Sequence, residues 1–297
     1  MIEAKENDFL GDAELFDEGE PLTATNDIGK DGIGKDGTGI SQPLVPVFLM
    51  VDTSWSMNEN NEYGGDTKIQ AVQKAVQEIG KELAAWQDDT GDIMRVSVLC
   101  FDSEVKWKYE NRDPSELMNI SFTADGATHI GDAFMKLEEL LHHEKFDDLG
   151  VSLYKRAVIV LLTDGCDCGS TITPDAGIRT LRQNNWFVTG TRIAFAVGAD
   201  ADIAPLEKFT GLREAVIKTS KVNVLRSLLE KLVVKASVTS SKGPNVGLNS
   251  EEQRAFDVKF QQSAEATKTI IEQVLLSKPV NGDDLDDFDL FGDVDPL

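Results

Sequence analysis

Hydrophobic positions between residues 44 and 236 follow two alternating patterns. Residues 45–51 and 157–162 are continuous apolar runs, which is typical of strands buried on both faces. Residues 68–86 instead repeat apolar positions at intervals of three and four from Ile69 to Leu83, the spacing of one helix face. The pattern therefore predicts a strand followed by a helix at the start of this region.

The same alternation continues along the chain. Besides strands at 44–51 and 156–163, we expect strands at 95–101, 105–109, 192–197 and 215–218, and helices at 130–141, 175–183 and 222–234. The two strands on either side of residues 102–104 are expected to pair as a hairpin. Strands that alternate with helices predict a doubly wound α/β fold, with a mostly parallel central sheet and helices on both faces.

The segments around this predicted domain, residues 43–237, differ from it in composition. Residues 1–42 are acidic and then glycine-rich, and predict a flexible arm. Residues 238–250 have the composition of a polar linker, and 251–278 show the pattern of an amphipathic helix. Residues 279–297 carry seven Asp among Leu and Phe. This acidic tail is either disordered and solvated or a docking motif for a second partner.

The charge and the cysteines narrow the class of protein. With 29 basic and 52 acidic residues the net charge is −23, which disfavours nucleic acid and anionic membranes as partners because both are polyanions. The first residues lack the basic and apolar segments of a secretory signal, and no apolar run is long enough to span a bilayer. Three cysteines, an odd count, do not indicate a disulfide framework. We therefore expect a cytoplasmic protein with reduced thiols.

Oxygen-bearing side chains follow the predicted strands. The first strand leads into an Asp-x-Ser-x-Ser loop formed by Asp52, Ser54 and Ser56; Thr128 precedes the second helix, and Asp164 follows the strand at 156–163. Open α/β sheets bind ligands at the carboxyl ends of their strands, so these three loops are expected to converge. Carboxylates and hydroxyls are hard ligands that suit Mg²⁺ better than a soft metal. The sequence thus predicts a magnesium site.

These motifs resemble the metal-ion-dependent adhesion site (MIDAS) of von Willebrand factor A (vWA) domains, over about residues 44–236. The resemblance implies that Asp52, Ser54, Ser56, Thr128 and Asp164 hold one Mg²⁺, directly or through water, with Mn²⁺ or Ca²⁺ as alternatives. It also implies that a protein partner completes the coordination with an Asp or Glu. The resemblance therefore implies that the protein binds a partner and does not catalyse a reaction.

Trp55 is a departure, because the family usually has Gly between the two serines. An indole at this position screens the metal, anchors a partner or simply faces outward, and the sequence leaves these readings open.

The opening Val-Pro-Val-Phe-Leu-Met-Val-Asp-Thr-Ser is similar to that of the bacterial tellurium-resistance (TerY-like) vWA proteins. This similarity implies a scaffold or adaptor in a bacterial stress-response or signalling complex. The alternative is a Mg²⁺-dependent phosphohydrolase. We expect no enzyme, because no general base near the predicted metal is identified in the sequence.

Two other motifs are weaker. Residues 29–36 approach a phosphate-binding loop, but Asp36 replaces the Ser or Thr that would meet Mg²⁺ and no strand precedes them. Cys166 and Cys168 follow Asp164, which allows redox sensing or soft-metal binding, although two thiols alone do not make a zinc site. Loop thiols without a function are the favoured interpretation.

Overall fold

A computed structural model describes residues 42–59, 65–149, 151, 153–164, 167–198, 201–219, 221–245 and 253–276. All of these belong to one compact unit, Ile40–Leu297. The expected arm (all but residue 42), the expected tail at 279–297, the loop at 29–36 and Cys166 lie outside the described residues.

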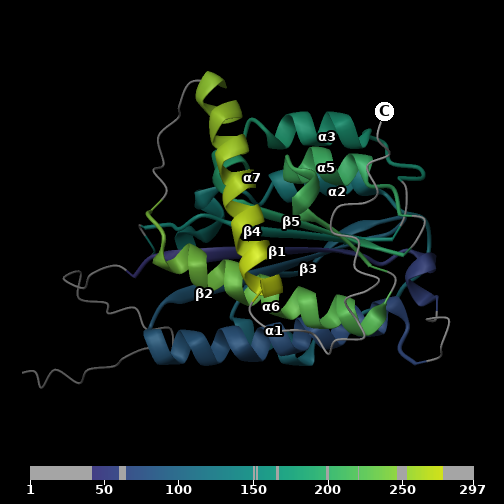
Figure 1. Ribbon diagram of the computed structural model, residues 1–297, viewed down its shortest axis with the longest axis horizontal. Coiled ribbons are helices and arrows are strands. Elements are labelled where there is room, and N and C mark those ends of the chain that lie inside the picture. Colours follow the sequence, from purple (N-terminus) through teal and green to yellow (C-terminus); the bar gives the residue numbers. More distant parts are fainter. Residues whose placement is uncertain are drawn as a thin grey trace, which may run out of the picture. The chain divides into compact units, whose positions relative to one another are not determined.

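A six-stranded sheet forms the centre of this unit, in the order β3-β2-β1-β4-β5-β6 (Figure 1). The strands are β1 Leu44–Asp52, β2 Ile93–Phe101, β3 Val105–Arg112, β4 Val158–Thr163, β5 Thr191–Val197 and β6 Val216–Thr219. Every neighbouring pair is parallel except β2 and β3, which form the expected hairpin. The predicted mostly parallel α/β fold is confirmed.

Helices cover both faces of the sheet. They are α1 Lys68–Thr90, α2 Ile130–Glu138, α3 Pro174–Leu181, α4 Asn185–Thr189, α5 Ala204–Thr210, α6 Val222–Lys242 and α7 Gln253–Leu276. Helices α1 and α6 pack on one face, and α2, α3 and α5 on the other, above the sheet in Figure 1. Among the described helices, none is both long and apolar enough to cross a membrane.

Strand β1 shows why the apolar runs are continuous. It lies between β2 and β4, and all nine of its residues are buried. Val47 and Leu49 contact the core on the α1–α6 side, whereas Phe48 and Met50 contact the core on the other side. A strand covered on both faces has no solvent-facing side chains, so its sequence does not alternate. Parallel pairing places the carboxyl ends of β1, β2 and β4 at one edge of the sheet.

Helix α6 continues beyond its expected end. Residues 238–242, expected to belong to the linker, are helical. The correction has a physical reason, because the serines there are buried rather than solvated: Ser240 and Ser241 are each 7% exposed, and the Ser240 hydroxyl donates to the carbonyl of Arg156. Composition alone suggested a linker, but tertiary packing of small polar residues keeps the helix intact.

The two short helices α4 and α5 were not predicted. Each spans fewer than two full helical turns, five and seven residues, so neither can show a repeating apolar pattern. The Asn184 side chain caps the first turn of α4, accepting from the amides of Trp186 and Phe187.

Helix α7 is attached to the sheet through a buried charge. Arg192, in β5, is 0% exposed. Its guanidinium donates to six acceptors, the carbonyls of Phe187, Val188, Gly190, Thr210 and Phe260 and the hydroxyl of Ser263. Phe260 and Ser263 belong to α7, and the Phe260 ring lies 4.0 Å from the guanidinium carbon. The last described helix is therefore part of the packed core.

Candidate metal centre

Asp52 lies at the carboxyl end of β1 and is 0% exposed. Its Oδ1 accepts a hydrogen bond from the Ser54 amide at 2.8 Å, and its Oδ2 accepts one from the Thr163 hydroxyl at 2.6 Å. Thr163 is the last residue of β4, so the carboxylate joins the ends of two central strands. Burial raises the pKa of Asp52 to about 6, although the hydrogen bonds from Ser54 and Thr163 oppose the rise.

The two serines extend from Asp52 to the second carboxylate. The hydroxyl oxygens of Ser54 and Ser56 are 3.2 Å apart, and the Ser56 hydroxyl donates to Asp164 Oδ1 at 2.7 Å. Ser54 precedes a short 3-10 helix, Trp55–Asn58, which contains Ser56. The structure thus brings four of the predicted site residues into one hydrogen-bonded set.

The main chain of Thr128 is bonded to the segment that follows β4. The residue is buried; its amide donates to Cys168 Sγ at 3.4 Å, and its carbonyl accepts from the Cys168 amide at 2.8 Å. On the other side, the Trp55 amide donates to the carbonyl of Gly126 at 3.0 Å. The loop that carries Thr128 therefore lies between the loops after β1 and β4. Among the described residues, we find no hydrogen bond from its hydroxyl to the other four candidate ligands.

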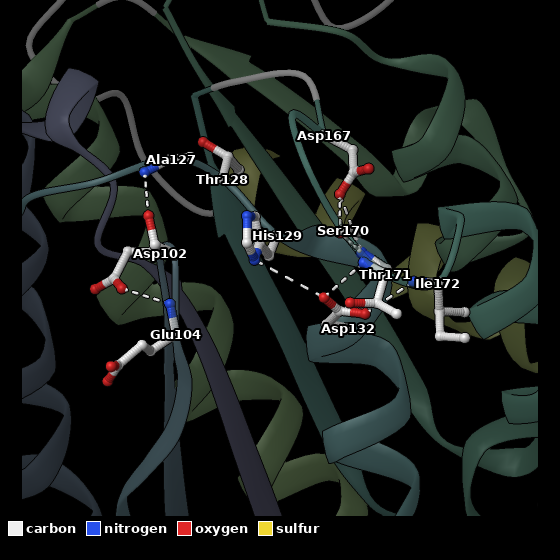
Figure 2. A network of polar contacts seen from close by, with 12 residues as sticks. Asp102, Glu104, Ala127, Thr128, His129, Asp132, Asp167, Ser170, Thr171 and Ile172 are labelled. Carbon is white, nitrogen blue, oxygen red and sulfur yellow. Dashed lines mark hydrogen bonds and ion pairs between the residues drawn. The ribbon is translucent and has the colours of Figure 1, made fainter.

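A polar network holds this loop on both sides (Figure 2). On one side the Ala127 amide donates to the Ser103 hydroxyl at 2.9 Å. On the other, the Gly131 amide donates to the Ser170 hydroxyl at 3.0 Å and to Asp167 Oδ1 at 3.3 Å, and Ser170 also bonds Asp167. Main-chain contacts of this kind fix the path of the loop independently of the Thr128 side chain.

Asp132 ties the first turn of α2 to the segment after β4. Figure 2 shows its carboxylate directed at Thr171 and Ile172, whose amides donate to it at 2.9 Å each. The backbones approach so closely that a Cβ on Gly131 would lie 1.8 Å from the Ile172 carbonyl oxygen. Only glycine fits at position 131, because of contact rather than backbone torsion.

Lys68 contacts the candidate centre and was not predicted from the sequence. Its ammonium lies 2.7 Å from Asp164 Oδ2 and 2.8 Å from Glu59 Oε2. The Asp164 side chain is only 1% exposed, so this ion pair is largely shielded from water. No motif marks the lysine, because it is the first residue of a helix and 96 positions from its partner. Thr163 was also missed, although it directly precedes Asp164 and ends a predicted strand.

The donor set fits a hard cation better than a soft one. Within the described ranges, no group of three or more His, Cys, Asp or Glu side chains is placed to hold a metal. The candidate centre instead combines two carboxylates with hydroxyls, the oxygen ligands that Mg²⁺ prefers. Cys100 is separate from it, and burial raises the pKa of its thiol to about 12.

Residues 47–166 match the family model of the von Willebrand factor type A domain. The match begins in β1 and includes all five candidate ligands, from Asp52 to Asp164. The fold is that of a vWA domain.

Solved structures share this vWA fold at low sequence identity. The pilus adhesin SpaC from Lactobacillus rhamnosus GG is 13% identical, with a TM-score of 0.50 over 68% of this chain and 31% of that one. Proximal thread matrix protein 1 from the mussel byssus, solved with a zinc-occupied MIDAS motif, is 21% identical, with a TM-score of 0.48 over 66% of this chain and 46% of that one. The matched part spans about half the length of the mussel structures. No curated protein matches the sequence.

Proposed function

We propose that this vWA domain binds one Mg²⁺ through Asp52, Ser54, Ser56, Thr128 and Asp164, and uses it to hold a protein partner. One observation carries the proposal: the Asp52 carboxylate is fully buried at the ligand-binding edge of the sheet, with neutral hydrogen-bond donors from Ser54 and Thr163. A buried carboxylate is costly unless it is paired or coordinates a metal. A divalent cation would offset the charge.

The surroundings of Asp52 support Mg²⁺ among hard cations. Mg²⁺ usually keeps several waters and takes few direct carboxylate ligands, which suits a set of hydroxyls with two carboxylates. Mn²⁺ and Ca²⁺ remain the alternatives. A coordination position filled by water would be free for an Asp or Glu of the partner, so that metal binding and partner binding are linked.

Trp55 supports a role in partner contact. It lies between the two serines and is 62% exposed, so its ring faces solvent beside the candidate metal. Exposed indoles at the edge of a binding site are frequent anchors in protein interfaces. We therefore favour the anchor over the interpretation in which Trp55 screens the metal.

Binding is favoured over phosphohydrolysis. His129 is the imidazole closest in sequence to a candidate ligand. Its Nδ1 lies 3.8 Å from Asp132 Oδ2 (Figure 2), and among the described residues no hydrogen bond joins its ring to Asp52, Ser54, Ser56 or Asp164. A scaffold role in a cytoplasmic bacterial stress-response or signalling complex is the finer part of the proposal. It rests on the tellurium-resistance-like opening of the domain, and its test is co-purification of partners with and without chelator.

The metal is tested by calorimetric titration of Mg²⁺ into chelator-treated protein. We expect one saturable site in the wild type and at least ~10-fold weaker binding in Asp52→Asn, because a charged ligand is lost while the shape is kept. Asp175→Asn is the matched control: it removes an exposed carboxylate that pairs with Lys208, and its affinity should equal that of the wild type. Equal Mg²⁺ affinity in Asp52→Asn and wild type would refute the site.

A further inference from the structure

Lys68 is placed as the first residue of α1, where a helix gains nothing from a positive charge. The amino end of a helix carries a partial positive charge, so a lysine there is mildly unfavourable. The helix is already capped without it, because Thr67 and Gln70 form a reciprocal capping box. Helix stability therefore does not explain a lysine at this position.

The contacts of Lys68 point instead to the candidate metal centre. Its side chain is 17% exposed, and its ammonium bridges Asp164 and Glu59. Its amide also donates to the Glu59 carbonyl at 3.3 Å. The neighbouring Ile69 is 4% exposed and packs into the core, which fixes the base of the lysine. The ammonium is thus held at Asp164 by both its main chain and its side chain.

The Lys68 ammonium makes the net charge of the centre less negative than that of its carboxylates alone. Asp52 and Asp164 together would present two negative charges to a metal. Lys68 offsets part of this charge: its ammonium is shared with the more exposed Glu59, but it contacts the buried Asp164 at the oxygen that Ser56 leaves free. A metal held at this centre would keep more of its own positive charge, and so attract an acidic ligand from outside more strongly.

We propose that Lys68 is a tethered cation that stabilises Asp164 in the metal-free protein and weakens the affinity of the centre for Mg²⁺. This inference rests on the proposed metal site. Lys68 is then a determinant of Mg²⁺ affinity. It keeps the centre folded without metal and allows the metal to bind reversibly.

The test compares the neutral variants Lys68→Met and Lys68→Gln with the wild type and with Lys74→Met. Lys74 is a matched control, because it lies on the same helix but pairs with Asp66 in an exposed position. All three substitutions lower the net charge equally. Mg²⁺ affinity is measured by calorimetry, and melting temperature is measured in chelator and in excess Mg²⁺.

We expect Lys68→Met and Lys68→Gln to bind Mg²⁺ about 10-fold more tightly than the wild type, because a nearby repelling charge has been removed. In chelator both variants should melt below the wild type, and Mg²⁺ should raise their melting temperature more than that of the wild type. Lys74→Met should match the wild type in each measurement.

Two other outcomes separate this inference from the proposed function. If the wild type binds Mg²⁺ and both neutral variants bind it equally or more weakly, Lys68 is only a structural ion pair and the inference is wrong. If no protein binds Mg²⁺, the metal site itself is wrong and the inference falls with it. Binding by the neutral variants alone would support the inference in its strongest form, a lysine that excludes the metal.

Discussion

Asp52 and Arg192 are both fully buried charges, at opposite edges of the same sheet. Every nitrogen of the Arg192 guanidinium meets at least one acceptor, all of them neutral carbonyls or a hydroxyl. Asp52 accepts from two neutral donors, Ser54 and Thr163. Burial shifts both groups toward neutrality: it lowers the pKa of Arg192 to about 9 and raises that of Asp52 to about 6.

The two buried charges differ in their interaction partners. Arg192 finds all its partners within the chain and connects β5, α4 and α7, so we interpret it as a structural charge. Asp52 lies beside hydroxyls and a second carboxylate at the carboxyl ends of the strands, where open α/β sheets bind ligands. We therefore interpret it as the proposed ligand of a cation. Substitutions at the two positions should therefore respond differently to metal.

The largest effect should follow Arg192→Met. The change removes the guanidinium that donates to carbonyls of α4, α5 and α7, and we expect a loss of about 3–5 kcal/mol in the free energy of unfolding. Urea denaturation in chelator and in Mg²⁺ should give the same loss. The control Arg179→Met, at an exposed position on α3, should change stability by less than ~0.5 kcal/mol. A metal-dependent loss in Arg192→Met would contradict the structural role.

In Asp52→Asn, unlike Arg192→Met, the change in stability should depend on Mg²⁺. In chelator its free energy of unfolding should lie within ~1 kcal/mol of the wild type, since an uncompensated buried charge has been removed. Mg²⁺ at 100 times the wild-type Kd should stabilise the wild type by ~2.7 kcal/mol, and the variant, whose binding is at least ~10-fold weaker, by no more than ~1.4 kcal/mol. Equal stabilisation of both proteins by Mg²⁺ would show that the metal binds elsewhere.

Gly131→Ala should show whether the backbone packing beside the site, and not only its candidate ligands, determines Mg²⁺ affinity. The added Cβ meets the Ile172 carbonyl, so the segments that hold Thr128 must move apart, at a cost of about 1–3 kcal/mol in unfolding free energy. Mg²⁺ binding should weaken as well, although no candidate ligand is changed. Wild-type stability and affinity in this variant would mean that the network in Figure 2 does not position the site.

The smallest effect on the domain itself should come from Trp55→Ala. Because the ring is mostly exposed, we expect unfolding free energy within ~0.5 kcal/mol of the wild type and an unchanged Kd for Mg²⁺. Only affinity for a co-purified partner should fall. A several-fold change in Mg²⁺ affinity would instead favour the screening role that the sequence left open.

The sequence predicted the parts of this molecule that depend on repeating patterns. Strands β1 and β4 are covered on both faces, so their apolar runs are unbroken, and the loops after them contain the candidate ligands. Helices α4 and α5 are too short to repeat, and the end of α6 depends on packing of serines. These features leave no periodic signal.

The candidate site divides in the same way. Asp52, Ser54 and Ser56 lie within one loop, so their spacing marks them. Thr163 is 111 residues from its partner Asp52, and Lys68 is 96 residues from its partner Asp164. Only folding brings these pairs together. Local motifs mark the candidate ligands, whereas the groups that contact those ligands come from distant parts of the chain.

The Arg192 cluster also bears on the order in which the chain completes its fold. The acceptors of Arg192 in α7 lie 68 and 71 residues farther along the sequence. A nascent chain that has made the sheet lacks both acceptors of the Arg192 Nη2 group until residues 260–263 have left the ribosome. Closure of the core is therefore expected late in synthesis, and a fragment that ends before α7 should be the first to aggregate or be degraded.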